Sequence, residues 1–438
     1  MRQRLLNEGA LRLEYEIREI VKKGRQLEAI GREIYWENIG DPIQKRAVVP
    51  EWIKEIVADL VHDDTTYGYC DSKGVLETRN FLAERTNADG GVTITAEDIL
   101  FFNGLGDAIA KLYQFLPPSS RIIGPSPAYS THSSSEAAHA NSEPLTYRLD
   151  PENNWYPDLD DLHNKIKYNP NVVGILIINP DNPTGMVYPE SYLKRMVDLA
   201  REYNLILISD EIYANLCFGE EKTCSLAKVI KEVPGIALKG ISKELPWPGA
   251  RCGWMEFYNR HSNPEFDRFC AALEDAKMVE VCSTTLPQKA IPLILSDERY
   301  QSYLDERNDN IARKNRRLAE IFGDMSEVIF VPSNGAFYNT IVFKSEAINP
   351  DQSPDVTDEQ VASILKNWLS KNLKPDQRFV YTMLATKGIC VVPLSSFHSE
   401  LNGFRITLLE EDEQRFELIF QGIKDAIITY CTPKAMME

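Results

Sequence analysis

The chain has 438 residues, which is enough for two to four domains at roughly 100–200 residues each. Hydrophobic residues make up 43% of it and charged residues 26%, and this balance excludes a disordered chain, a collagen-like fibre and a disulfide-stapled miniprotein. The formal charge of −17 argues against nucleic acid as a partner, because a phosphate backbone needs a basic face.

The cysteines and the N-terminus indicate the compartment. Eight cysteines are scattered with no Cys-x-x-Cys pair, which favours buried thiols in a reducing compartment over a disulfide framework. Residues 1–24 are charged throughout and lack the apolar core of a secretory signal. No segment reaches the run of about 18 apolar residues that a membrane span needs. We therefore predict a soluble, cytoplasmic protein with no membrane partner.

The first predicted elements are a helical arm and an α/β region. Residues 9–30 carry spaced apolar side chains among charges, as a helix does. Between residues 50 and 295, apolar strands at 99–102, 121–123, 172–178, 205–209 and 235–238 alternate with helices at 108–115, 190–203 and 224–232. This alternation predicts a mostly parallel sheet, in which ligands bind at the carboxyl ends of the strands.

From about residue 300 the pattern becomes that of an α+β region. We expect a long charged helix at 298–322, strands at 328–331, 337–343 and 388–392, and helices at 357–369 and 411–429. Residues 345–358 are typical of a surface loop. The predicted organisation is an N-terminal arm over 1–45, a large domain over 46–300 and a small α+β domain over 301–438.

Two turns that follow predicted strands are candidates for ligand binding. Residues 103–107 (Asn-Gly-Leu-Gly-Asp) open a helix and could bring backbone N–H groups to an anion, although a plain tight turn is an equal interpretation. Position 109 is Ile, where a dinucleotide-binding loop has its third Gly. Residues 179–185 (NPDNPTG) form a stiff turn that aims Asn182 above the sheet, or simply end the strand.

Asp210 and Lys243 are candidates for the chemistry itself. Asp210 ends an apolar strand, where a carboxylate needs a cationic partner such as a protonated ring nitrogen, and Tyr213 could reach the same ligand. A helix N-cap is the alternative for Asp210. Lys243 lies in a Gly-rich loop after the next strand, where a desolvated amine could form an imine. A solvated loop lysine is the alternative.

Two arginines could bind anions. Arg251 follows Lys243 by eight residues, and its planar guanidinium suits a phosphate or a carboxylate. Arg405 lies among apolar residues of an expected strand at 403–408, so it needs an anionic partner, which could also be a structural one. Taken together, these turns and side chains predict a ligand that has a phosphate, a ring nitrogen, a phenolic oxygen and an aldehyde. Pyridoxal phosphate has all four groups.

The order of these motifs resembles that of the class I aminotransferases of fold type I. The shared motifs are NPxNPTG at 179–185, Asp-Glu-x-Tyr at 210–213, Ser-Lys at 242–243 with Arg251 after it, and Phe-Arg at 404–405. Segments 15–18, 68–74, 155–161 and 253–255 look most like the bacterial alanine (glutamate–pyruvate) aminotransferases. The resemblance implies an α/β fold with a seven-stranded, mostly parallel sheet, a smaller α+β domain, and pyridoxal 5'-phosphate as cofactor with no metal.

The resemblance also implies a role for each candidate residue. Lys243 would hold the cofactor as a Schiff base and move the substrate proton, and Asp210 would pair with the ring nitrogen. Other cofactor contacts would come from Tyr213 and Asn182 at the phenolic oxygen, Tyr129 on the ring, and Leu105, Gly106, Ser242 and Arg251 at the phosphate. The substrate would meet Arg405, Gly40 and Asn182, under an arm that carries Tyr15 and Arg18. Tyr69 would reach the phosphate of the neighbouring subunit, which implies a homodimer.

The predicted reaction is ping-pong transfer of an amino group from alanine, or another small or neutral amino acid, to 2-oxoglutarate or pyruvate. Alternatives are an aspartate or aromatic aminotransferase, a C–S lyase that uses the same cofactor, and a regulatory module. The sequence departs from the wider family at Gly240, at residues 244–248 (ELPWP) and at Leu394. Residues 278–288 contain no Arg for a distal carboxylate, so specificity for a dicarboxylic amino acid is unsupported.

Overall fold

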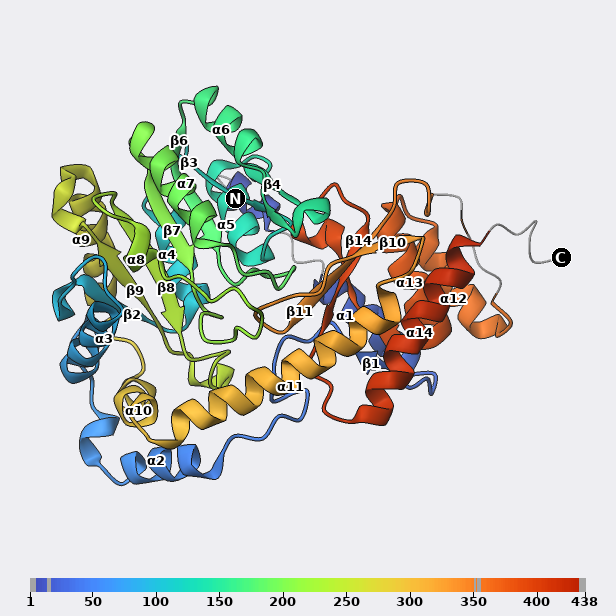
Figure 1. Ribbon diagram of the computed structural model, residues 1–438, viewed down its shortest axis with the longest axis horizontal. Coiled ribbons are helices and arrows are strands. Elements are labelled where there is room, and N and C mark those ends of the chain that lie inside the picture. Colours follow the sequence, from blue (N-terminus) through green and yellow to red (C-terminus); the bar gives the residue numbers. More distant parts are fainter. Residues whose placement is uncertain (1–4, 14–16, 350–351, 353–355, 433–438) are drawn as a thin grey trace.

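The computed structural model describes residues 5–13, 17–349, 352 and 356–432 (Figure 1). The chain begins with a 3₁₀ turn, η1 (Glu8–Arg12), and helix α1 (Ile17–Glu28), so the expected arm helix is divided. Residues 14–16 of the predicted arm lie outside the described residues. No helix among the described residues is long and apolar enough to cross a membrane.

The described residues form three sheets, and the largest has eight strands in the order β2-β9-β8-β7-β6-β3-β4-β5. Their bounds are β2 (Ile99–Phe102), β3 (Arg121–Ser126), β4 (Thr146–Asp150), β5 (Tyr156–Pro157), β6 (Val172–Ile178), β7 (Ile206–Asp210), β8 (Gly235–Gly240) and β9 (Gly253–Tyr258). The pairs β4/β3, β3/β6, β6/β7 and β7/β8 are parallel, whereas β9 is antiparallel to both of its neighbours. The mostly parallel sheet is confirmed, but a two-residue edge strand, β5, makes eight strands where seven were expected, because Leu149 and Asp150 pair with it.

Helices cover both faces of this sheet, which explains why its central strands are apolar on both sides. The helices are α2 (Glu51–Val61), α3 (Leu76–Ala88), α4 (Leu105–Gln114), α5 (Ser130–Ala140), α6 (Leu159–Lys167), α7 (Glu190–Glu202), α8 (Leu226–Val229), α9 (Pro264–Val279) and α10 (Thr285–Leu295). One core cluster joins α4 and α9 to one face, and a larger cluster joins α3, α6, α7, α8 and α10 to the other.

The second part of the fold has its own sheet and core. Its antiparallel strands are β10 (Val328–Phe330), β11 (Tyr338–Phe343), β14 (Gly403–Thr407) and β13 (Val392–Pro393), in that order. Helices α12 (Glu359–Leu369), α13 (Pro375–Lys387) and α14 (Glu413–Cys431) pack with it, as does α1. Strand β1 (Tyr35–Trp36) pairs in parallel with β12 (Ile389–Cys390), so the N-terminal segment joins this part of the molecule.

Helix α11 (Arg299–Phe322) connects the two parts (Figure 1). Tyr300 and Leu304, near its start, belong to the core of the large sheet, whereas Ile311 and Leu318 belong to the second core. A single helix is therefore packed into both cores. The predicted domain boundaries at residues 45 and 300 stay a prediction.

Two predicted elements differ from the structure. The helix expected at 224–232 is only α8, because Lys231 takes a left-handed φ of 54° and Pro234 follows soon after. The strand expected at 388–392 is divided into β12, which pairs with β1, and β13, which pairs with β14.

Candidate active site

A cavity of about 430 Å³ lies between the carboxyl ends of the large sheet and strands β11 and β14 of the second sheet. Eleven of the predicted site residues line it: Gly40, Leu105, Gly106, Tyr129, Asn182, Asp210, Tyr213, Ser242, Lys243, Arg251 and Arg405. Three do not. Tyr69 is 85% exposed and does not line the cavity of its own chain, Tyr15 lies outside the described residues, and so does the side chain of Arg18.

One end of the cavity is built to hold an anion. Gly104 precedes α4 with a φ of +84°, and a Cβ there would lie 2.4 Å from Nη2 of Arg251. The first N–H groups of α4, at Leu105 and Gly106, have no partner within the helix and lie at its positive end. The Arg251 guanidinium donates to Pro248 O at 3.1 Å and to Asn103 O at 3.4 Å, which fixes it beside these groups.

Asp210 lies at the end of β7 and is 3% exposed. Its Oδ2 is 2.9 Å from Nε2 of His132, and its Oδ1 accepts from Ile212 N at 3.2 Å. His132 is itself buried, in the first turn of α5, and its ring meets Tyr129 edge to face. A buried carboxylate is therefore fixed by a histidine behind it and lines the cavity on its other side.

Tyr213 donates from its hydroxyl to the hydroxyl of Tyr338 at 3.1 Å. Burial, with Tyr338 beside it, raises the pKa of the Tyr213 hydroxyl well above its usual value. Tyr213 therefore stays a neutral phenol near pH 7, and its single proton can be donated to a ligand oxygen in place of Tyr338.

Lys243 reaches across the cavity from the turn after β8. Its Nζ donates to Gly40 O at 2.7 Å, and the ring centre of Phe337 is 5.8 Å from it. Gly40 must lack a side chain, because a Cβ there would lie 2.1 Å from the Tyr338 hydroxyl oxygen. A primary amine thus lies between the anion end of the cavity and the segment before α2.

Arg405 lies in β14 with its guanidinium between two rings, 4.5 Å from the centre of Tyr338 and 5.1 Å from that of Phe397. It donates to Asn182 Oδ1 at 3.2 Å and to Asn38 O at 2.7 Å. Its Nε is buried without a hydrogen-bond partner, and no carboxylate of the described residues lies within 4.0 Å of its nitrogens. A buried guanidinium in this state is a site for an anionic ligand group.

The sequence matches the family of class I and II aminotransferases over residues 38–418. The chain belongs to this family. The predictions of an aminotransferase and of a fold type I architecture are confirmed.

The relatives of this aminotransferase cover between 74% and 98% of the chain. An uncharacterized aminotransferase of Methanocaldococcus jannaschii is 53% identical over 427 residues, covering 98% of this chain and 99% of the relative. The glutamate-pyruvate aminotransferase AlaA of Escherichia coli K12 is 31% identical over 327 residues, covering 74% and 79%. The solved structure of an alanine aminotransferase from Pyrococcus furiosus has a TM-score of 0.83 and 26% identity, covering 97% of this chain and 99% of that one.

Three residues that contact the predicted site residues were not found from the sequence: His132, Asn38 and Tyr338. His132 has a local signal, since it comes three residues after Tyr129 and so lies one helical turn away from it. Asn38 and Tyr338 have none, because Asn38 contributes its backbone carbonyl and Tyr338 belongs to a strand that was predicted only as core. Their places depend on how the two parts of the fold pack.

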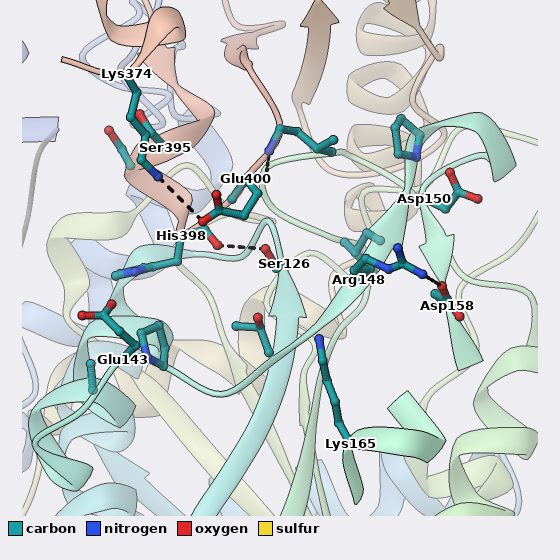
Figure 2. A pocket seen from close by; sticks show the side chains of 18 of the residues that line it. Ser126, Glu143, Arg148, Asp150, Asp158, Lys165, Lys374, Ser395, His398 and Glu400 are labelled. Atoms are coloured by element: carbon teal, nitrogen blue, oxygen red, sulfur yellow. Dashed lines mark hydrogen bonds and ion pairs between the residues drawn. The ribbon is translucent and has the colours of Figure 1, made fainter. Parts of the chain in front are cut away.

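A second, larger cavity of about 720 Å³ lies between the loop at 394–398 and the segment at 143–151 (Figure 2). This loop separates the two cavities: Phe397 stacks on Arg405, whereas Ser126 donates to His398 O at 2.8 Å in the second one. The second cavity contains none of the predicted site residues, and cations on its wall, such as Arg148 beside Asp158, are paired with carboxylates. The smaller cavity is therefore the candidate active site.

Proposed function

We propose that this aminotransferase uses pyridoxal 5'-phosphate to transfer the amino group of alanine, or of another small neutral amino acid, to 2-oxoglutarate or pyruvate. One observation carries the proposal: a primary amine, a buried carboxylate and a helix N-terminus with its arginine all line one cavity of about 430 Å³. These groups match the aldehyde, the ring nitrogen and the phosphate of the cofactor.

The residues present fit the cofactor group by group. Leu105, Gly106, Ser242 and Arg251 would hold its phosphate, where the missing side chain of Gly104 leaves room for the arginine. Asp210, fixed by His132, would keep a proton on the ring nitrogen. Tyr213 and Asn182 would donate to the phenolic oxygen, and Tyr129 would cover one face of the ring.

Bound pyridoxal phosphate supplies an electron sink for the bond that breaks at the substrate α-carbon. The chain's own residues do the rest. Arg405 and Asn182 would bind and orient the substrate carboxylate, which satisfies the orphaned Nε of Arg405. Lys243 would act as the base that removes the proton from the substrate α-carbon and then as the acid that gives a proton back.

The preference for a neutral amino acid rests on the charges around the cavity. Its cationic side chains among the described residues are Lys243, Arg251 and Arg405. Each is already assigned above to the cofactor or to the substrate α-carboxylate. The remaining wall includes Val21, Ile39 and Ile212, which are apolar, and the carboxylate of Asp41. Among the described residues this wall offers no cation for a second carboxylate, so pyruvate suits it better than 2-oxoglutarate as the acceptor, and the name of the Pyrococcus enzyme agrees with alanine.

We also propose a homodimer in which Tyr69 reaches the cavity of the neighbouring subunit. Its ring is 85% exposed, and Tyr67, Val279 and Val281 are exposed as well. Thr285 donates to Gly68 O at 2.8 Å, which joins the segment of Tyr69 to the one that follows α9. Such exposed apolar side chains are typical of a surface that another chain covers. A cytoplasmic location agrees with the free thiols of all eight cysteines.

The test is a visible absorbance spectrum of the purified protein before and after L-alanine is added. We expect a band from the lysine-bound cofactor that alanine removes and that 2-oxoglutarate or pyruvate restores. A band that other amino acids remove but alanine does not would change the substrate. Release of ammonia without an acceptor would indicate a lyase, and no band after reconstitution would refute the cofactor.

A further inference from the structure

The segment directly after Lys243 is tied to helix α11 by one side chain. Glu244 accepts at Oε2 from Asn215 Nδ2 at 2.6 Å, and its Oε1 accepts from the hydroxyl of Tyr300. Its backbone carbonyl accepts from Arg307 Nη1. The loop that carries the lysine is therefore held at three atoms of the next residue.

The same helix also holds the turn that carries Tyr213. Asn308 Nδ2 donates to Asn215 O at 3.0 Å, so Asn215 is bonded to Glu244 on one side and to α11 on the other. Tyr300, Arg307 and Asn308 are seven and eight positions apart, which puts them on one face of a helix. Two separate loops of the cavity thus meet on one face of α11.

Burial raises the pKa of the Glu244 carboxyl, and the hydrogen bond from Asn215 and the charges of Arg85 and Arg307 oppose this shift. A carboxylate in such a place is costly unless its hydrogen bonds are well formed. The Glu244 carboxyl does not line the cavity, so it can act on the reaction only through the residues that it holds.

We propose that Glu244 is a positioning residue for transamination: it fixes the loop of Lys243 and the turn of Tyr213 to the same face of α11. This inference rests on the proposed function. Lys243 must place its Nζ at the reacting atoms, and a misplacement of about 1 Å can cost roughly 100-fold in rate. Because Glu244 is the next residue in the chain, any shift of its backbone also moves Lys243.

The test compares Glu244→Ala, Glu244→Gln and Tyr300→Phe in the full-length holoenzyme. The readout is the single-turnover rate at which L-alanine removes the visible band. We expect a loss of roughly 10- to 100-fold in Glu244→Ala with KM within about twofold. Glu244→Gln keeps an oxygen for Tyr300 but turns an NH2 donor toward the Asn215 amide, so it should recover only part of the rate. Tyr300→Phe, which keeps the bond from Asn215, should also lose only part of the rate. Tyr203→Phe is the control, because its hydroxyl bonds His163, which does not line the cavity.

Hydrogen exchange gives a second readout that does not depend on catalysis. In Glu244→Ala, peptides that cover 241–250 and 211–217 should exchange at least tenfold faster, while peptides from α14 stay unchanged. A rate in Glu244→Ala within twofold of the parent, or a loss of protection spread over the whole chain, would overturn the positioning role. If the parent protein reacts with no amino acid, the proposed function fails, and the exchange pattern still decides whether Glu244 fixes the two loops.

Discussion

Lys45→Met should destabilise the second part of the fold strongly. Lys45 is 8% exposed, and its Nζ contacts Glu37 and lies 3.5 Å from Glu410. Glu37 is fully buried and also accepts from Thr407 at 2.9 Å. Removing one partner of a buried ion pair costs about 3–5 kcal/mol, because the other charge stays buried without compensation. We expect a loss of this size in the free energy of unfolding, measured by urea titration.

The segment at 37–45 also carries Asn38 O and Gly40 O, which accept from Arg405 and Lys243. Lys45→Met should therefore raise KM for the amino acid as well.

The control for this prediction is Lys314→Met. Lys314 is as buried as Lys45, at 8%, but its partner Glu411, 3.1 Å away, is 43% exposed on its side chain and can be solvated when the lysine is lost. The cost should stay within about 1 kcal/mol. The double variant Glu37→Gln with Lys45→Met removes both charges and should recover part of the stability. If Lys45→Met costs no more than Lys314→Met, the reasoning about the buried pair is wrong.

Three further outcomes test the site. Lys243→Ala should abolish the visible band and turnover, and an active variant would remove Lys243 from the chemistry. Arg405→Lys should lower kcat/KM by roughly 30-fold or more, since truncating a buried charged partner costs about 2 kcal/mol or more; an unchanged KM would contradict carboxylate binding. Burial raises the pKa of Asp181 to about 7, so the folded chain keeps a proton there that the unfolded chain releases above about pH 4. Stability should therefore fall as pH rises from about 4 to 7, and Asp181→Asn should flatten this slope in urea titrations. Part of the slope that remains in Asp181→Asn should come from Asp376, because burial raises the pKa of its carboxyl to about 6.

The carboxyl ends of the parallel strands could be predicted because each strand is an apolar run that the sequence shows directly. Asp210 and Lys243 each follow such a run, and the parallel pairs β6/β7 and β7/β8 bring their ends to one edge. Strand β9 was missed because Glu256 interrupts its apolar pattern. That carboxylate is buried against Lys239 at 2.9 Å, a partner that only the paired sheet reveals.

Helices without an apolar stripe were also missed. Helix α5 buries serines and His132 in place of large apolar side chains, and α13 is buried over nearly its whole length, so neither has the one-sided pattern of a surface helix. Because His132 lies in α5, its contact with Asp210 was missed with the helix. The carboxylate side of the cavity could not be derived either, since it needs β14, β11 and the segment before α2 in one place.

The ribosome makes the proposed cofactor-binding residues well before it makes the arginine proposed to bind the substrate. The groups proposed to hold the cofactor lie between Leu105 and Arg251, whereas Arg405 follows Arg251 by 154 residues. At about 5–20 residues per second, roughly 8–30 seconds of synthesis lie between them. A ribosome-bound chain therefore carries every proposed cofactor ligand of its own subunit before the arginine for the substrate has been translated. We therefore expect the set of proposed cofactor ligands to be complete before the substrate site is.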